Sequence, residues 1–187
     1  MVNSAEKFWY ALRITYSREL ALKNYLDTEK VENFLPMRYE YVFRGERKIR
    51  KLVPVIHNLI FVRLSRKEMD ELKATVGERL PIRYIMDRET RQPIIIPDVQ
   101  MRNFIAVAGS YDQQVIYLDP TITSFKKGDR VRVTGGIFNG VEGYFLRIKG
   151  DRRVVVAIEG LMAVATAYIH PSLVEPILPD PTDQKNK

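Results

Sequence analysis

A glycine-rich stretch, 125–143, constrains the fold more than any other part of the sequence. It reads FKKGDRVRVTGGIFNGVEG and holds five glycines within 16 residues. Its valines alternate with polar residues, which predicts a half-buried strand. Asn139-Gly140 predicts a hairpin turn, because both residue types tolerate a positive φ angle. The apolar run 144–148 is then the expected partner strand, so this region favours a small β-structure with close backbone contacts.

The spacing of this stretch resembles the KOW motif, in which two strands and a glycine-rich loop begin a small β-barrel. Ile137 stands where the motif usually has proline, and the matching positions are Gly128, Val131, Val133, Gly135, Ile137, Phe138, Gly140 and Gly143. Apolar runs at 154–158, 162–169 and 173–176 are predicted to be further strands. The resemblance implies a five-stranded, SH3-like barrel over 124–178, whereas the residues alone also allow an unrelated small barrel.

The N-terminal half of the chain alternates apolar strands with amphipathic helices. Phe8–Ile14 is predicted to be a strand, and a helix is expected from Arg18 to about Thr28 with Ser17 as its N-cap. Leu59–Leu64 is nearly continuously apolar and predicts a buried strand, after which Ser65 opens a capping box and a second helix. Further strands and a third helix follow. This order predicts an antiparallel sheet with flanking helices, which belongs to the α+β class.

The predicted elements form two domains. We expect an α+β domain over 6–109, a linker over 110–123, the barrel over 124–178 and a disordered polar tail over 179–187. Within the barrel, Met162–Ala167 is rich in alanine and is compatible with a strand or a helix. We predict a strand there.

Composition excludes several classes of enzyme. The chain has 187 residues and no cysteine, which rules out a disulfide scaffold, thiolate chemistry and cysteine metal sites. The sequence contains no phosphate-binding loop, nucleophile elbow or paired catalytic carboxylates. His57 and His170 lack the spacing of metal ligands. We therefore expect a protein that is not an enzyme and that uses no metal or cofactor.

Net charge and hydropathy indicate the class of binding partner and the cellular location. The formal net charge of +7 favours a nucleic-acid partner, although an acidic protein partner or simple solubility also explains it. The N-terminus lacks the layout of a signal peptide, and no apolar run approaches 18 residues. We expect a cytoplasmic protein without membrane contact.

The order of these elements resembles the NusG family of transcription elongation factors. The likeness covers about 8–177 and is carried by Trp9-Tyr10, Leu35-Pro36-Met37, Arg44-Gly45, Asn58 to Val62, and Ile94 to Pro97. Two segments, Arg44 to Arg47 and Asn58 to Val62, look closer to specialised antiterminators of the RfaH and UpxY type than to housekeeping NusG. One segment departs from the family: Val55-Ile56-His57 stands where aromatic residues and a proline are usual.

The resemblance implies that an apolar hollow docks on the clamp helices of RNA polymerase. Carried onto this chain, the hollow includes Ile56, Leu59 and Phe61. By strand alternation, Leu59 and Phe61 share one face of the sheet, while Ile60 and Val62 share the other. One face is expected to lie under the domain's helices and the other to be available to a partner. The competing interpretation is that Leu59 and Phe61 are ordinary core.

Two groups of residues are candidates for contact with nucleic acid. The first is a basic loop whose cations can follow a phosphate backbone without reading sequence: Arg44, Arg47, Lys48, Arg50 and Lys51. A solvated hairpin tip explains these residues equally well. The second follows from the resemblance, which places the first helix against the displaced non-template strand: Arg18, Lys23 and Tyr25. Arginines of the barrel are expected mostly to form an exposed polar face: Arg130, Arg132, Arg147, Arg152 and Arg153.

Together these features predict a bacterial transcription elongation factor or antiterminator. We expect its first domain to bind RNA polymerase and non-template or upstream DNA, and to suppress pausing or termination, on selected operons. The barrel is expected to recruit a ribosomal protein or a termination factor, and the protein to associate with the nucleoid through transcription complexes. Two alternatives stay open: a ribosomal or ribosome-assembly protein that binds RNA through its KOW barrel, and, more weakly, a nucleic-acid-processing enzyme.

Overall fold

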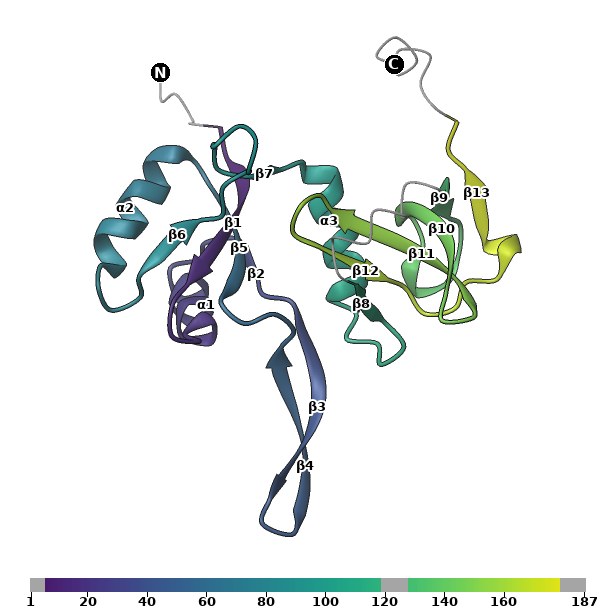
Figure 1. The fold of residues 1–187 in the computed structure, drawn as a ribbon, viewed down its shortest axis with the longest axis horizontal. Coiled ribbons are helices and arrows are strands. Elements are labelled where there is room, and N and C mark those ends of the chain that lie inside the picture. The colour runs from purple at the N-terminus through teal and green to yellow at the C-terminus, as the bar shows by residue number, and fades with distance from the viewer. Residues whose placement is uncertain (1–5, 119–127, 179–187) are drawn as a thin grey trace. The chain divides into compact units, whose positions relative to one another are not determined.

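The computed structural model describes residues 6–118 and 128–178, and the chain divides into two units, 1–101 and 102–187 (Figure 1). The first unit contains, in chain order, β1 (Phe8–Ile14), α1 (Glu19–Thr28), β2 (Asn33–Phe34), β3 (Met37–Arg44), β4 (Arg47–Pro54), β5 (Leu59–Leu64), α2 (Arg66–Val76), β6 (Ile82–Tyr84) and β7 (Ile95–Ile96). Helix α3 (Asp98–Ala108) crosses the division. The second unit contains β8 (Ile116–Leu118), β9 (Asp129–Val133), a 3-10 helix (Gly136–Phe138), β10 (Glu142–Ile148), β11 (Asp151–Ile158), β12 (Met162–Ala165), a second 3-10 helix (Pro171–Leu173) and β13 (Val174–Pro176).

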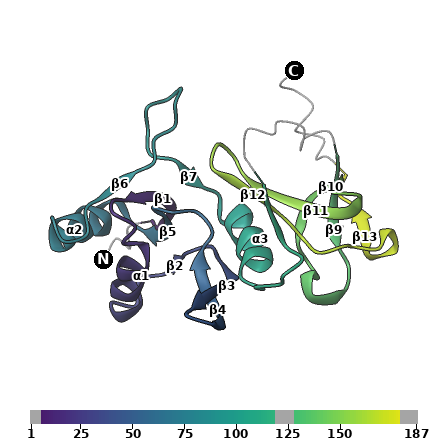
Figure 2. The same cartoon turned by 60° about the horizontal axis from the view of Figure 1, so that its bottom comes forward.

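The first unit is built around β1, which lies in the middle of an antiparallel sheet. The strand order is β2-β5-β1-β6, and β7 also pairs with β1. Helices α1 and α2 pack on one face of this sheet (Figure 2), through Leu22 and Leu26 of α1 and Met69 and Leu72 of α2. Apolar side chains of β1 and β5 that point to this face complete the core. The prediction of an α+β domain with flanking helices is therefore confirmed.

The two helices begin differently. Ser65 caps α2 as predicted: its hydroxyl accepts from the Glu68 backbone N–H at 3.2 Å, and the Glu68 carboxylate accepts from the Ser65 N–H at 2.8 Å. The prediction that Ser17 caps α1 is wrong. Ser17 has a φ angle of 50° and the cap position is Arg18, which makes no side-chain cap hydrogen bond. The Ser17 N–H instead donates to Asn58 Oδ1 at 2.9 Å, so a contact with the loop before β5 displaces the local cap.

Loss of the α2 cap should measurably destabilise the first unit. Ser65→Ala is expected to lower the free energy of unfolding by about 1 kcal/mol, because the Glu68 N–H loses its acceptor. Urea denaturation followed by Trp9 fluorescence measures this, since Trp9 lies in the same unit. Thr75→Ala, on the exposed side of α2, is the control and should change stability by less than about 0.5 kcal/mol. Equal stability of the two variants would contradict the assigned cap.

Glu68 makes the contribution of this cap dependent on pH. Hydrogen bonds, first from Lys7 Nζ at 2.7 Å and then from the Ser65 backbone, lower the pKa of the Glu68 carboxyl below its ordinary 4.5. Because the folded-state pKa is depressed, the stabilisation is present at neutral pH and is lost as pH falls through that pKa.

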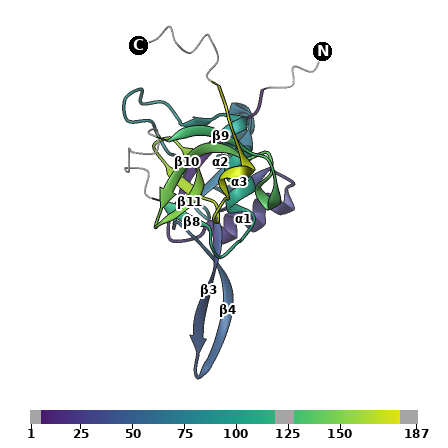
Figure 3. The same ribbon diagram turned by 90° about the vertical axis from the view of Figure 1, so that its right-hand side faces the viewer.

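Strands β3 and β4 form a long two-stranded arm that projects from the first unit (Figure 3). Their pairing runs from Met37 opposite Pro54 to Arg44 opposite Arg47, and only Gly45 and Glu46 lie outside the strands. Gly45 has a φ angle of 63°, a conformation that side chains disfavour. The basic segment was expected to be a loop or a hairpin tip. The structure shows that most of it is the strand β4.

The second unit is an antiparallel sheet of six strands, in the order β13-β9-β10-β11-β12-β8. Five strands were expected; the additional strand, β8, comes from the segment predicted to be a linker. Ile116 and Leu118 of β8 pack against a core that includes Val155 and Ala163, which explains why this part of the chain joins the sheet. Met162–Ala165 is a strand, as predicted. The remaining linker residues 119–123, the barrel residues 124–127 and the tail 179–187 lie outside the described part of the chain.

The glycine-rich hairpin joins β9 to β10 as the KOW resemblance implies, but its turn differs from the expected one. Asn139 has a φ angle of −52°, and only Gly140 takes a positive value, 85°, within this Asn-Gly pair. Gly143 marks a close approach: a Cβ there would lie 2.4 Å from the Val155 carbonyl oxygen. The hairpin therefore needs glycine for two different reasons, backbone conformation at 140 and space at 143.

The division between the units falls inside α3, ahead of the expected domain end at residue 109. The second half of the helix contacts the second unit: Asn103 Oδ1 accepts from the Glu142 N–H at 3.2 Å, and the Tyr117 hydroxyl donates to the Ala108 carbonyl at 3.5 Å. Sequence periodicity defines this helix but carries no information about which unit its contacts favour.

Candidate functional site

The predicted docking residues Leu59 and Phe61 lie on the face of the sheet opposite α1 and α2. The core beneath those helices contains Ile60 and Val62, so the predicted alternation is confirmed. Phe61 is opposite Ala11 of β1 and Phe34 of β2. Leu59 is 5% exposed and Phe61 is fully buried. Neither side chain is an open surface in this structure, and a partner reaches them only if the residues that cover them move away.

Ile56 is the half-buried member of the predicted docking set, and its loop is held by hydrogen bonds at both ends. The Val55 N–H donates to the Pro36 carbonyl at 2.9 Å, and the Asn58 carbonyl accepts from the Ile14 N–H at 3.1 Å. His57 Nδ1 lies 3.3 Å from the buried Glu19 carboxylate. These contacts fix the loop without the proline that is usual in the family.

The five basic residues of the arm are all exposed, but cross-strand pairing divides them between two faces. One face carries Arg44, Arg47 and Lys51, and the other carries Lys48 and Arg50. Between 37 and 54 the arm has six basic and two acidic residues. This excess of positive charge gives the arm the electrostatic character of a phosphate-binding element.

Two of the three residues predicted at the first helix line a hollow of about 460 Å³. Arg18 and Tyr25 line it together with Ala21, Thr75, Val76, Arg79 and Leu80. The Arg18 guanidinium donates to the Arg79 carbonyl at 2.6 Å. Lys23 is not part of this hollow and pairs with Asp27 at 2.8 Å. Sequence analysis missed Arg79, because nothing in its local pattern shows that the end of α2 faces α1.

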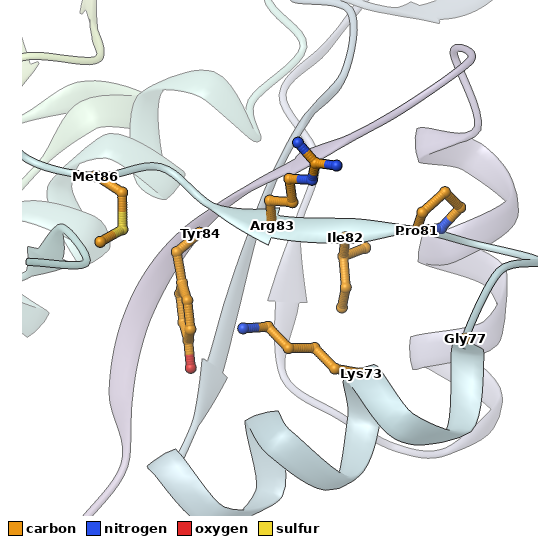
Figure 4. Close-up of a pocket in the computed structure, with 7 residues that line it drawn as sticks. All are labelled: Lys73, Gly77, Pro81, Ile82, Arg83, Tyr84 and Met86. Carbon is orange, nitrogen blue, oxygen red and sulfur yellow. The ribbon is translucent and has the colours of Figure 1, made fainter.

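A second hollow, of about 480 Å³, lies between α2 and β6 (Figure 4). Its main feature is Tyr84, whose ring centroid lies 3.8 Å from Lys73 Nζ and 5.0 Å from the Arg66 guanidinium. Burial lowers the pKa of the Lys73 ammonium and raises the pKa of the Tyr84 hydroxyl. Because Arg66 and Lys73 both contact the Tyr84 ring, we interpret this hollow as packing at the edge of the core rather than as an anion-binding site.

Two arginines of the second unit have structural roles. Arg153 is 6% exposed, and its guanidinium donates to the carbonyls of Gln114 and Thr166, each at 2.7 Å. Arg132 is exposed and pairs with Glu142 at 2.7 Å and Glu175 at 3.3 Å. Arg153 is the exception to the expected exposed polar face, because a strand register that points it inward gives it two carbonyl partners. The remaining three are exposed: Arg130, Arg147 and Arg152.

The described residues contain no cluster of three or more histidine or acidic side chains placed to hold a metal ion. Over the same part of the chain, no helix has the length and apolar character needed to cross a membrane.

Comparison with known proteins places the first unit in a family. The profile of the NusG family, described as transcription termination factor nusG, matches residues 7–105, which is more than half of the chain. No curated protein matches the sequence. Among solved structures, the chain is similar to NusG of Thermotoga maritima, in a structure described by its domain interaction, with 22% identity over 92% of this chain and 98% of that one, at a TM-score of 0.45. On the strength of the family match across β1 to α3, the chain belongs to the NusG family.

Proposed function

We propose that this protein is a transcription elongation factor that binds RNA polymerase through its first unit and catalyses no reaction. The observation that carries the proposal is the NusG family match over 7–105, which covers the sheet with Leu59 and Phe61, the arm and the α1 hollow. Binding alone is sufficient for such a function, because a factor that binds the active state of polymerase more tightly than the paused state shifts the population toward it.

The proposed docking surface is the sheet face of Leu59 and Phe61, with Ile56 at its rim. A helical tip of the polymerase clamp needs an apolar hollow, and burial contributes roughly 25 cal/mol per Å² before ordering costs. Leu59 and Phe61 are buried in the free chain, so docking requires that their covering residues be displaced. Part of the binding free energy is then used to expose this face, and Ile56 offers the first contact.

The proposed nucleic-acid contacts lie elsewhere on the first unit. The α1 hollow combines Arg18 and Arg79 with the ring of Tyr25, a combination that suits a base and its phosphate on the displaced non-template strand. The exposed cations of the arm suit the phosphates of upstream DNA. These sites support the finer proposal that the protein is an antiterminator of the RfaH and UpxY type acting on selected operons.

The second unit is proposed to recruit a further partner, a ribosomal protein or a termination factor, while the first stays on polymerase. With this division of labour, the proposed site of action is the bacterial cytoplasm, at the nucleoid. Its support is the combination of a glycine-rich KOW-like hairpin with a separate sheet and core.

Co-purification tests the proposal directly. A tagged full-length chain, isolated from cells after nuclease treatment, is expected to retain RNA polymerase subunits in a stable, stoichiometric amount. Ribosomal subunits, isolated in parallel, are the comparison. A chain that retains ribosomes or ribosomal RNA but no polymerase would replace the proposal with a ribosome-binding role for the KOW-like unit.

A further inference from the structure

One face of the β3–β4 arm combines aromatic rings with positive charges. Cross-strand pairing places Tyr39, Tyr41 and Phe43 of β3 on the same face as Lys48 and Arg50 of β4. The two outer rings are widely accessible, with Tyr41 57% and Phe43 73% exposed. Rings grouped at the surface of a projecting element are typical of a binding surface, since a folded chain gains nothing by leaving them in water.

This aromatic face bears positive charge without a balancing acid. The arm has two carboxylates, and both lie off the face: Glu40 is on the opposite side, where Arg38 donates to it, and Glu46 is in the turn. Within the described arm, 37–54, no carboxylate therefore shares the face with Lys48 and Arg50. A partner that presents negative charges and flat apolar groups together is complementary to it.

Rings and cations alternate along the face. The Arg50 guanidinium lies 3.8 Å from the ring centroid of Tyr39, and Lys48 Nζ lies 4.2 Å from that of Tyr41. The residue directly across from Arg50 is Tyr41, and the residue directly across from Lys48 is Phe43. Each cation therefore contacts the ring that lies one step nearer the base of the arm than its direct cross-strand neighbour. Phe43, nearest the tip, is consequently the most exposed ring of the series.

The spacing of the rings suits unpaired bases. Alternate residues on a strand lie about 6.7 Å apart, and stacked bases are about 3.4 Å apart. One base therefore fits between two successive rings, in the space that a cation occupies in the free arm. An exposed cation–π contact is weaker than stacking of a base on a ring, and the displaced ammonium can pair with a phosphate. Bases in a duplex are already stacked and paired, so they cannot enter.

We propose that the face formed by Tyr39, Tyr41, Phe43, Lys48 and Arg50 binds a single strand of DNA. Its bases stack on the rings, and its phosphates pair with the two cations. The choice of DNA rests on the proposed function, in which the arm works beside a duplex that polymerase has opened. The stacking itself depends only on this chain.

Binding of labelled oligothymidylate of about 12 nucleotides to the full-length protein, followed by fluorescence anisotropy, tests the proposal. Phe43→Ala is expected to weaken binding by about five-fold or more, the loss expected for one stacked base. Ile49→Ala is the matched control, because Ile49 is 41% exposed, sits on the opposite face and pairs with Val42. It should leave affinity unchanged. A duplex of the same length should bind more weakly and should not respond to Phe43→Ala.

A second variant reports stacking itself. Trp emission of Phe43→Trp is expected to be quenched by oligothymidylate, whereas emission of Ile49→Trp should stay nearly constant. The native Trp9 is 4% exposed and contributes the same background to both. Equal quenching of the two variants would show that the strand lies on the arm without preference for this face, and would overturn the proposal.

Three further results would also overturn it. Equal affinity for duplex and single strand would reduce the arm to a phosphate contact. Tighter binding of oligouridylate than of oligothymidylate would assign the face to RNA. Weaker retention of polymerase by Phe43→Ala, with unchanged oligonucleotide binding, would assign it to a protein. Retention of polymerase is measured separately. A wild-type protein that retains polymerase but does not bind oligothymidylate contradicts only the arm proposal, and one that binds oligothymidylate but does not retain polymerase contradicts only the elongation-factor proposal.

Discussion

Ile56→Asp is expected to weaken the binding of RNA polymerase by roughly 100-fold, since an unpaired carboxylate would be desolvated in an apolar contact. Ile56 is half-buried in the loop before β5, the strand of Leu59 and Phe61, so the free protein tolerates the charge. Its loop is held by backbone hydrogen bonds that do not involve the side chain. Titration of purified polymerase with the tagged protein measures the loss.

Leu20→Asp is the matched control for this experiment. Leu20 is 40% exposed on α1, the helix that covers the other face of the sheet. It should retain polymerase at the wild-type level, and circular dichroism should show that both variants melt as the wild type does. Undiminished binding by Ile56→Asp, or equal loss in both variants, would remove the docking face from the proposal.

Gly143→Ala is expected to destabilise the second unit by about 3 kcal/mol or more, because the site has no room for a methyl group. The added Cβ would lie 2.4 Å from the Val155 carbonyl oxygen and 2.8 Å from Val154 Cγ1. The obstacle is partly backbone of the paired strand β11, which cannot move aside as a long side chain can. Amide exchange, which should become faster across β10 to β12, measures the effect. The unfolding transition of the first unit, followed by Trp9 fluorescence, should keep its midpoint.

Gly160→Ala separates this steric effect from conformational strain. Gly160 has a φ angle of 71° and nothing within 4 Å of an added Cβ. Its substitution should cost only about 1–2 kcal/mol, the penalty for a left-handed conformation. Similar exchange rates in the two variants would mean that the close approach at Gly143 relaxes freely, contrary to the packing described above.

Sequence reasoning succeeded where a local rule determined the structure. The capping box at Ser65 was predicted because its two hydrogen bonds join residues three apart. It failed at Ser17, where a contact with Asn58, 41 residues away, sets the backbone. It also failed at β8, since the apolar run 116–118 becomes a strand only through pairing with β12.

The candidate site shows the same limit. Alternation correctly separated Leu59 and Phe61 from Ile60 and Val62, because side-chain direction in a strand has a period of two. It could not show that Leu59 and Phe61 are covered, since burial depends on distant parts of the chain. The alternating rings at 39, 41 and 43 were visible in the sequence. Their significance required the register of β3 with β4, which places Lys48 and Arg50 beside them.

The inward-pointing Arg153 has a consequence for how the second unit can be isolated. It ties residue 114 to the sheet through the Gln114 carbonyl, and β8 just beyond covers the edge of β12. A fragment that starts at residue 124 would lack both, leaving an apolar strand with a free row of backbone donors and acceptors. Unpaired strand edges of this kind pair with other chains, so the fragment that starts at residue 124 should self-associate. A fragment that begins ahead of residue 114 should stay monomeric.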